Sequence, residues 1–508
     1  MNTSDTIQFY NALVKNHERR IQAVFEKHLK QCAKEKLTFG GRHMYSFLRP
    51  NFITLEQYRY IQYVCKILRN AVTKFKNAAL ENPIIMEQAG LLDRERELVM
   101  MDPGYDRLSI TARWDSFMAG DELKFVELNA ECPAGIAYSD IAAKVYDKLP
   151  MIREFKKHFN VEKFTIRQEL LNGLLSTYAV WRGNKKNKKP RIAIVDWREV
   201  PTFTEFQLFQ EFFKSKKLDC IIVDPRDLTY EKGRLMAGKK EIDLVYKRIL
   251  TNDCVEKPEE TKALVQAYRD QNVCMINPFR AKLVHKKSMF AVLTHEKNQK
   301  LFNGEELSVV LKHIPWTRML RDEITYFNGK QIDLLDYVST YKNNFVIKPN
   351  DEYGGKGVCL GMEATDQQWS AVLHEAKNGE HYVVQELVKI PKQPFPTVIN
   401  GNLEFVDMVV DMDPYAFGPN VEGILTRLSA SSLANVTAGG GTTPTFVITK
   451  KTKKAKKTLK NEIRRFISKQ KPKLSYLKTN NKKTKKKVTV KRRSKKIEMI
   501  NKNKYLII

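Results

Sequence analysis

The segment "FVIKPNDEYGGKGVCLG", residues 345–361, places a lysine at the end of an apolar run and three glycines in the turn that follows. Lys348 ends a predicted strand and precedes a proline, a position that plain packing does not explain. Gly354, Gly355 and Gly357 permit positive φ angles, and successive N–H groups in such a turn can hold phosphate oxygens. "VCLG" predicts a return strand, which puts the glycines at the tip of a flap. An ordinary tight β-turn is the alternative.

Other phosphate-binding motifs are missing from the sequence. The chain has no GxxxxGK[ST] loop and no HRD…N or DFG set, so it is neither a P-loop NTPase nor a protein kinase. About thirty residues beyond the glycines, "HYVVQELVKIP" predicts a strand that leaves through Gln385 and Glu386. Its backbone could face an adenine edge, and an ordinary buried strand is the alternative.

A second unusual segment, "RWDSFMAGDELKFVELNAECPAG" (residues 113–135), sets acids and an amide among strand formers. Two strand patterns flank "MAGD", whose Gly-Asp pair is typical of a turn, so we predict a β-hairpin. Side chains alternate along a strand. Arg113 and Asp115 therefore share one face of the first strand, and Glu127 and Asn129 share one face of the second.

The register of this hairpin decides whether the acids meet. A turn centred on Asp121 puts Asp115 opposite Glu127, whereas a turn centred between Gly120 and Asp121 puts them on opposite faces. Opposed like charges destabilise a sheet, but a divalent cation reverses the effect. Asp, Glu and an Asn carbonyl are hard oxygen ligands suited to Mg²⁺. The alternative is a surface hairpin with solvated acids.

The patterns along the chain predict an α/β (α+β) protein with five segments. Helical spacing, with Thr54 and Gln57 as a capping box, predicts a helical N-terminal region. Short β-branched runs from "RIAIVDW" to "VCMINP" alternate with helical stretches and predict a parallel sheet; no GxGxxG follows its first strand. We expect a helical region at 1–90, the hairpin part at 91–150, a Rossmann-like α/β subdomain at 151–280, a nucleotide-binding part at 281–448 and a disordered Lys-rich tail at 449–508.

The formal net charge of +30 belongs mainly to the end of the chain. Residues 450–508 hold 25 Lys and Arg against two Glu, which leaves the rest only mildly basic. The tail lacks interleaved aromatics, so we expect nucleic acid to bind only non-specifically, through residues 450–508. The seven Cys form no CxxC pair, and no signal peptide or membrane span is visible. We expect a cytoplasmic protein without zinc.

Together these segments resemble the ATP-grasp superfamily in its circularly permuted form. The metal-ligand hairpin comes about 220 residues before the lysine strand, with the spacing D-x11-E-x-N. This order is similar to that in the synthetase domain of glutathionylspermidine synthetase and in bacterial circularly permuted ATP-grasp proteins. The resemblance covers roughly residues 105–448, where we expect an ATP-grasp fold with a Rossmann-like pre-ATP-grasp subdomain. The amidase domain of that synthetase has no counterpart here, nor do its glutathione and spermidine contacts.

The resemblance implies roles for individual residues. Asp115, Glu127 and Asn129 match the metal ligands, and Arg113 and Arg427 match arginines near the transferred phosphate. The ATP contacts would come from Lys287, Lys348, Gly354, Gly355, Gly357, Gln385 and Glu386. The implied cofactors are ATP and Mg²⁺, with two ions, and the implied substrates are a small-molecule or peptide carboxylate and an amine.

The implied reaction is ligation through an acyl phosphate, which needs positioned charges but no protein nucleophile. The absence of a recognisable Ser-His-Asp or Cys-His set agrees with this. Two alternatives remain at this point. One is a non-catalytic ATP-grasp scaffold that binds nucleotide or a partner, and the other is a nucleic-acid-binding protein that acts through the basic tail.

Overall fold

The computed structural model describes residues 3–39, 42–107, 109–183, 189–352, 354–379, 381–430 and 440–451. The chain divides into two units, Met1–Thr449 and Lys450–Ile508, and the fold described below is that of the first. Beyond residue 451, the predicted Lys-rich tail lies outside the described residues. Within the described part of the chain, no helix combines the length and the apolar character needed to cross a bilayer.

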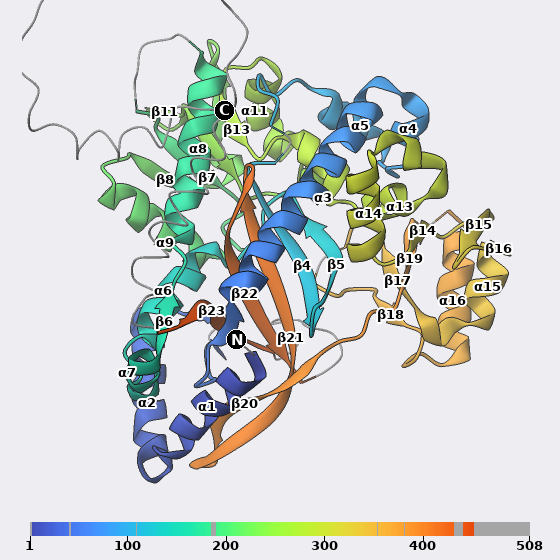
Figure 1. Ribbon diagram of the computed structural model, residues 1–508. Coiled ribbons are helices and arrows are strands. Elements are labelled where there is room, and N and C mark those ends of the chain that lie inside the picture. The colour runs from blue at the N-terminus through green and yellow to red at the C-terminus, as the bar shows by residue number, and fades with distance from the viewer. Residues whose placement is uncertain are drawn as a thin grey trace, which may run out of the picture. The chain divides into compact units, whose positions relative to one another are not determined.

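An eight-stranded sheet forms the centre of the first unit (Figure 1). The order of six strands is β3-β23-β22-β21-β4-β5, while β20 pairs with β21 and β6 with β23. The strands are β3 (Asn51–Thr54), β4 (Thr111–Ala119), β5 (Glu122–Asn129), β6 (Phe159–Glu162), β20 (Lys392–Ile399), β21 (Asn402–Phe417), β22 (Asn420–Ser429) and β23 (Gly441–Lys450). The predicted hairpin is thus β4–β5, and it lies beside strands encoded about 300 residues later.

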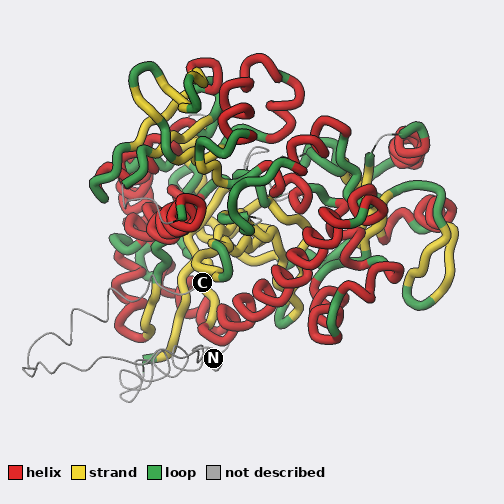
Figure 2. Tube along the Cα trace, turned by 90° about the horizontal axis from the view of Figure 1, so that it is seen from above, coloured by secondary structure: helices red, strands yellow, loops and turns green. Residues whose placement is uncertain are grey.

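Helices cover both faces of this sheet because its side chains alternate between two cores. In β23, Phe446 and Ile448 pack into one core and Val447 into the other. Figure 2 shows strands lying between helices. The first core contains α1 (Thr3–Lys15), α2 (Ile21–Lys34), α6 (Ile136–Tyr146), α7 (Pro150–His158) and α8 (Ile166–Arg182). The second contains α3 (Leu55–Glu81), α4 (Pro83–Glu87), α5 (Asp93–Met100), α12 (Lys282–His285), α13 (Ser288–Thr294) and α14 (Gly304–His313).

The predicted Rossmann-like sheet is confirmed as four parallel strands in the order β13-β12-β7-β8. They are β7 (Ile192–Val195), β8 (Cys220–Val223), β12 (Leu244–Lys247) and β13 (Cys274–Ile276). The associated helices are α9 (Phe203–Ser215), α10 (Thr251–Glu256) and α11 (Pro258–Arg269). A small antiparallel sheet consists of β9 (Leu228–Glu231), β10 (Arg234–Ala237) and β11 (Lys240–Glu241).

The glycine segment belongs to a further four-stranded sheet, ordered β14-β19-β17-β18. Its strands are β14 (Thr317–Met319), β17 (Phe345–Pro349), β18 (Cys359–Leu360) and β19 (Tyr382–Glu386). β18 is the predicted return strand and pairs antiparallel with β17. The helices α15 (Leu334–Thr340) and α16 (Asp366–Lys377) pack on this sheet, next to the hairpin of β15 (Ile324–Phe327) and β16 (Lys330–Asp333).

The N-terminal region is mainly helical, as predicted, and α3 begins at the predicted capping box of Thr54 and Gln57. The region also contains short strands that the sequence did not reveal: β1 (Thr38–Phe39), β2 (Arg42–His43) and β3. β3 pairs in parallel with β23, so the early segment is part of the central sheet. The five-segment division of the chain stays a prediction.

Candidate functional site

The register of the β4–β5 hairpin brings the two acids face to face. Its turn is centred between Gly120 and Asp121, because Ala119 pairs with Glu122. A register shift between Asp115 and Ser116 nevertheless pairs Asp115 with Glu127 and Arg113 with Asn129. The turn centred between Gly120 and Asp121 therefore describes the pairing near the turn, and the register centred on Asp121 describes the pairing beyond it. A β-bulge between the two parts accounts for the change of register.

Apolar spacing in β5 explains the bulge. Leu123, Phe125 and Leu128 all pack into the same core, although Phe125 and Leu128 are separated by an odd number of positions. One extra residue is needed for both to face inward, and Val126 supplies it. Glu127 consequently turns to the opposite face, toward the pocket.

Asp115 lies in a buried network of ion pairs. Arg113 binds it through two hydrogen bonds, Nε to Oδ1 at 2.7 Å and Nη2 to Oδ2 at 2.8 Å. Arg427 on β22 donates from Nη2 to Oδ2 at 2.7 Å, and the Asn129 side chain also bonds to it. Burial by itself would raise the pKa of Asp115, but the two guanidinium groups outweigh burial and lower the pKa to about 2.

Two further acids belong to this network, and the sequence analysis missed both. Asp411 and Asp413 lie on β21, where Asp411 pairs with Arg427 across the strands. Arg427 bonds to the carboxylate of Asp411 and lies 2.9 Å from Asp413 through Nε. Burial raises the pKa of both acids, against the effect of Arg427. Acids at alternate positions of an apolar strand, in "VVDMDPY", are the signal that could have revealed them.

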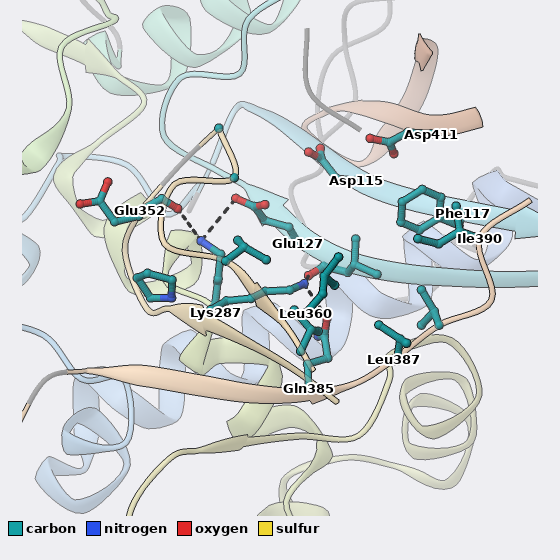
Figure 3. Close-up of a pocket in the computed structure, with 18 of the residues that line it drawn as sticks. Asp115, Phe117, Glu127, Lys287, Glu352, Leu360, Gln385, Leu387, Ile390 and Asp411 are labelled. Atoms are coloured by element: carbon teal, nitrogen blue, oxygen red, sulfur yellow. Dashed lines mark hydrogen bonds and ion pairs between the residues drawn. The ribbon is translucent and has the colours of Figure 1, made fainter. Parts of the chain in front are cut away.

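Lys287 connects the hairpin to the glycine loop. Its Nζ donates to the backbone oxygen of Glu352 at 2.5 Å and lies 3.6 Å from Oε1 of Glu127 (Figure 3). Lys287 directly precedes α13, and its N–H donates to the backbone oxygen of Asn350 at 3.0 Å. The lysine is therefore held at both its backbone and its side chain beside the loop.

Lys348 approaches the same hairpin from β17. Its Nζ donates to Oε1 of Gln385 at 2.7 Å and to the backbone oxygen of Val126, the bulge residue, at 3.3 Å. Burial lowers the pKa of Lys348 to about 8, although Glu127 acts in the opposite direction. An anion bound next to this ammonium group would favour its charged form.

The loop between β17 and β18 adopts positive φ angles at its three glycines, a conformation that glycine favours. Gly354, Gly355 and Gly357 have φ angles of +68°, +78° and +71°. A Cβ atom on Gly357 would lie 2.6 Å from Cγ of Pro349, so a side chain there would clash with the strand end. Tyr353, which precedes the glycines, lies outside the described residues.

The predicted adenine linker lies at the end of β19. Gln385 is buried and donates from Nε2 to the hydroxyl of Thr317 at 3.0 Å, so its side chain supports Lys348 from within the sheet. The N–H of Glu386 donates to the backbone oxygen of Trp316 at 2.8 Å. Gln385 and Glu386 both line the pocket.

A single pocket unites these elements. Its empty volume is about 980 Å³, open mouth included. The predicted residues on its wall are Arg113, Asp115, Glu127, Asn129, Lys287, Lys348, Gly354, Gly355, Gln385, Glu386 and Arg427. Gly357 is not part of the wall, while Asp411 and Lys356 are. Convergence of the hairpin and the glycine loop is thus a fact of the structure, and the roles of the individual residues stay predictions.

Comparison with known proteins gives a family match over most of this region. The sequence model of the family named circularly permuted ATP-grasp type 2 matches residues 118–437. A Synechocystis sp. protein, itself uncharacterised, is 25% identical over 268 residues, which cover 49% of this chain and 52% of that protein. A Frankia casuarinae protein named as a glutamate–cysteine ligase is 24% identical over 271 residues, 48% of this chain and 28% of its own. The chain spans about half or less of the length of these relatives.

A solved structure shows the same fold. The apo form of a glutathione synthetase-like effector from Globodera pallida superposes with a TM-score of 0.55. The match covers 85% of this chain and 97% of that chain, at 11% sequence identity. At this identity, the similarity concerns the fold alone.

Proposed function

The chain belongs to the circularly permuted ATP-grasp type 2 family, and from this premise we propose that it is an ATP- and Mg²⁺-dependent ligase that joins a carboxylate to an amine. The family and the fold class predicted from the sequence are thereby confirmed. One observation carries the proposal. The β4–β5 hairpin, which carries two acids and an amide, lies on the same pocket wall as the glycine loop and its lysine strand. About 220 residues separate these two elements in the sequence.

The cations of the pocket support the binding of a triphosphate. Lys287, at the N-terminus of α13, and Lys348, on β17, both line the pocket. Arg113 and Arg427 line it at the hairpin. Backbone N–H groups of the positive-φ loop would hold phosphate oxygens between them. Val346 and Leu360, on adjoining strands, offer an apolar wall for a base.

The donors present fit a magnesium ion that phosphate oxygens complete. Asp115, Glu127 and Asn129 supply two carboxylates and an amide oxygen on one wall, as Mg²⁺ prefers. Asp411 lines the same pocket, where its carboxylate is bound by Arg427. A cation bound by these residues would neutralise charge on the phosphates. The proposal includes two Mg²⁺ ions, as the resemblance to the family implies.

In the proposed reaction, a carboxylate oxygen of the first substrate attacks the γ-phosphorus and ADP leaves. The amine nitrogen of the second substrate then attacks the acyl carbon, phosphate leaves and the nitrogen gives up a proton. The residues of the chain orient the phosphates and balance their charge. The name of the Frankia relative supports an amino acid or peptide as the source of the carboxylate.

The test combines two variants with a substrate screen. ADP release is measured with pools of amino acids, peptides and polyamines, for the parent and for Glu127→Ala and Lys348→Ala. Each variant should lose about 10²–10³ in rate, the usual cost of one contact to developing charge. Turnover at the parental rate by both variants would show that the site is misassigned. Nucleotide binding without ADP release from any pool would favour the non-catalytic scaffold.

A further inference from the structure

A cluster of charged side chains, buried except for one aspartate that is 17% exposed, lies outside the pocket wall, near the ends of β5 and β17. We call it the rear cluster, and its acids and lysines are balanced three to three. Its members are Glu95, Glu131, Lys247, Lys282, Lys286 and Asp351. None of the six lines the pocket described above, and the resemblance to the ATP-grasp family assigned no role to any of them.

Lys282 is the member that joins the hairpin to the glycine loop. Its Nζ lies 2.6 Å from Oδ1 of Asp351, 3.5 Å from Oε2 of Glu131 and 3.5 Å from Oε1 of Glu95. Glu131 comes two residues after β5 ends, and Asp351 comes two residues after β17 ends. One ammonium group therefore holds the two strand ends that enter the site.

The arrangement repeats that of Lys287 at the pocket wall. Lys287 connects Glu127 of the hairpin with Glu352 of the loop, and Lys282 connects Glu131 with Asp351. The wall-side lysine would exchange its contacts for phosphate when nucleotide binds. The rear lysine is 1% exposed and has no access to ligand, so its bridge persists.

Stability alone gives little reason to keep such a bridge. Buried ion pairs often contribute no more than well-packed apolar residues would, because desolvation offsets their attraction. Glu131 is already paired, since Lys247 lies 3.2 Å from its Oε1 and the N–H of Thr251 donates to the same oxygen at 3.1 Å. The contact that Lys282 adds is the one that reaches the loop.

We propose that Lys282 is a positioning residue, which sets the distance between the metal-ligand hairpin and the glycine loop by bridging Glu131 and Asp351. The inference rests on the proposed function, because it concerns the nucleotide that those two elements would bind. Lys282 touches neither nucleotide nor substrate and acts through the loop.

Lys286 provides a matched control. It is 3% exposed and shares two acids with Lys282, at 2.7 Å from Glu95 and 3.6 Å from Asp351. Among the described residues, Glu131 forms ion pairs with Lys247 and Lys282 but not with Lys286. Lys282→Met and Lys286→Met each remove one buried positive charge from the same cluster. Only the first removes the bridge between Glu131 and Asp351.

Calorimetry measures the Kd of each protein for a non-hydrolysable ATP analogue in the presence of Mg²⁺. Urea unfolding of the same proteins is followed in parallel. Lys282→Met should weaken binding about tenfold and Lys286→Met less than about threefold, within the range of coupling inside one ion-pair network. Lys282→Arg should restore most of the affinity. Glu131→Gln should add little to Lys282→Met, since the bridge is already broken. If Lys282→Met does not fold, Asp351→Asn tests the same bridge from the loop side and should also lose about tenfold.

Equal losses of affinity in the two lysine variants, or no loss in either, would overturn the inference while leaving the proposed function intact. A purely structural role predicts such parallel losses, in step with stability. A parent protein that binds no analogue would instead overturn the proposed function, and the inference with it.

Discussion

Raising the pH should weaken nucleotide binding through Lys348. Burial lowers the pKa of this lysine to about 8 in the ligand-free protein, and its Nζ is held by Gln385 and the bulge residue Val126. Only the charged form attracts phosphate strongly. As the pH passes the pKa from below, the charged fraction falls, so affinity falls with rising pH.

The pKa sets the size of the effect. With a pKa of about 8, the charged fraction is about 0.9 at pH 7 and about 0.1 at pH 9, so the apparent affinity should fall about tenfold over that range. Binding at pH 8 should take up about half a proton, since phosphate raises the pKa of the bound lysine.

Titration calorimetry in buffers of different ionisation enthalpy measures both quantities. Lys348→Arg is the control, because a guanidinium group stays charged throughout this range. The variant should bind with an affinity that changes little from pH 7 to 9 and with no proton uptake at pH 8. A tenfold decline in Lys348→Arg equal to that of the parent would refute the reasoning.

Three further predictions concern the framework of the site. Gly357→Ala should weaken nucleotide binding about tenfold through strain in the loop, whereas Gly329→Ala, also at positive φ but in open space, should not; calorimetry compares the two. Asn277 bonds to backbone groups at both ends of the hairpin, so Asn277→Ala should cost at least about 3 kcal/mol in urea unfolding. Arg427→Met leaves Asp411 and Asp413 poorly paired and should cost about 3–5 kcal/mol; adding Mg²⁺ should raise the Tm of this variant more than that of the parent.

Features that depend on a few neighbouring residues could be predicted from the sequence. The capping box at Thr54 works through side chain and backbone three residues apart, so its signal is local. The return strand after Gly357 and the parallel strands around Ile192 are likewise encoded in short apolar runs and turn residues. The convergence of hairpin and loop, in contrast, was expected only because the chain resembles a known family.

Features that depend on distant partners could not be predicted. The bulge at Val126 arises because Phe125 and Leu128 must both reach a core built from later helices. Asp411 is understandable only opposite Arg427, across a pairing that the sequence does not specify. The parallel pairing of β3 with β23 joins segments almost 400 residues apart, a distance over which periodicity carries no information.

The pairing of Asp115 with Arg427, 312 residues further along the chain, bears on the order of events at the ribosome. At about 5–20 residues per second, the later partner is translated roughly 15–60 s after the earlier one. Throughout that delay the nascent hairpin lacks the strand that flanks it, and Asp115 is paired with Arg113 but not yet with Arg427. The window is long enough for chaperones to engage, so the yield of active protein should depend on translation speed between these codons more than elsewhere in the message.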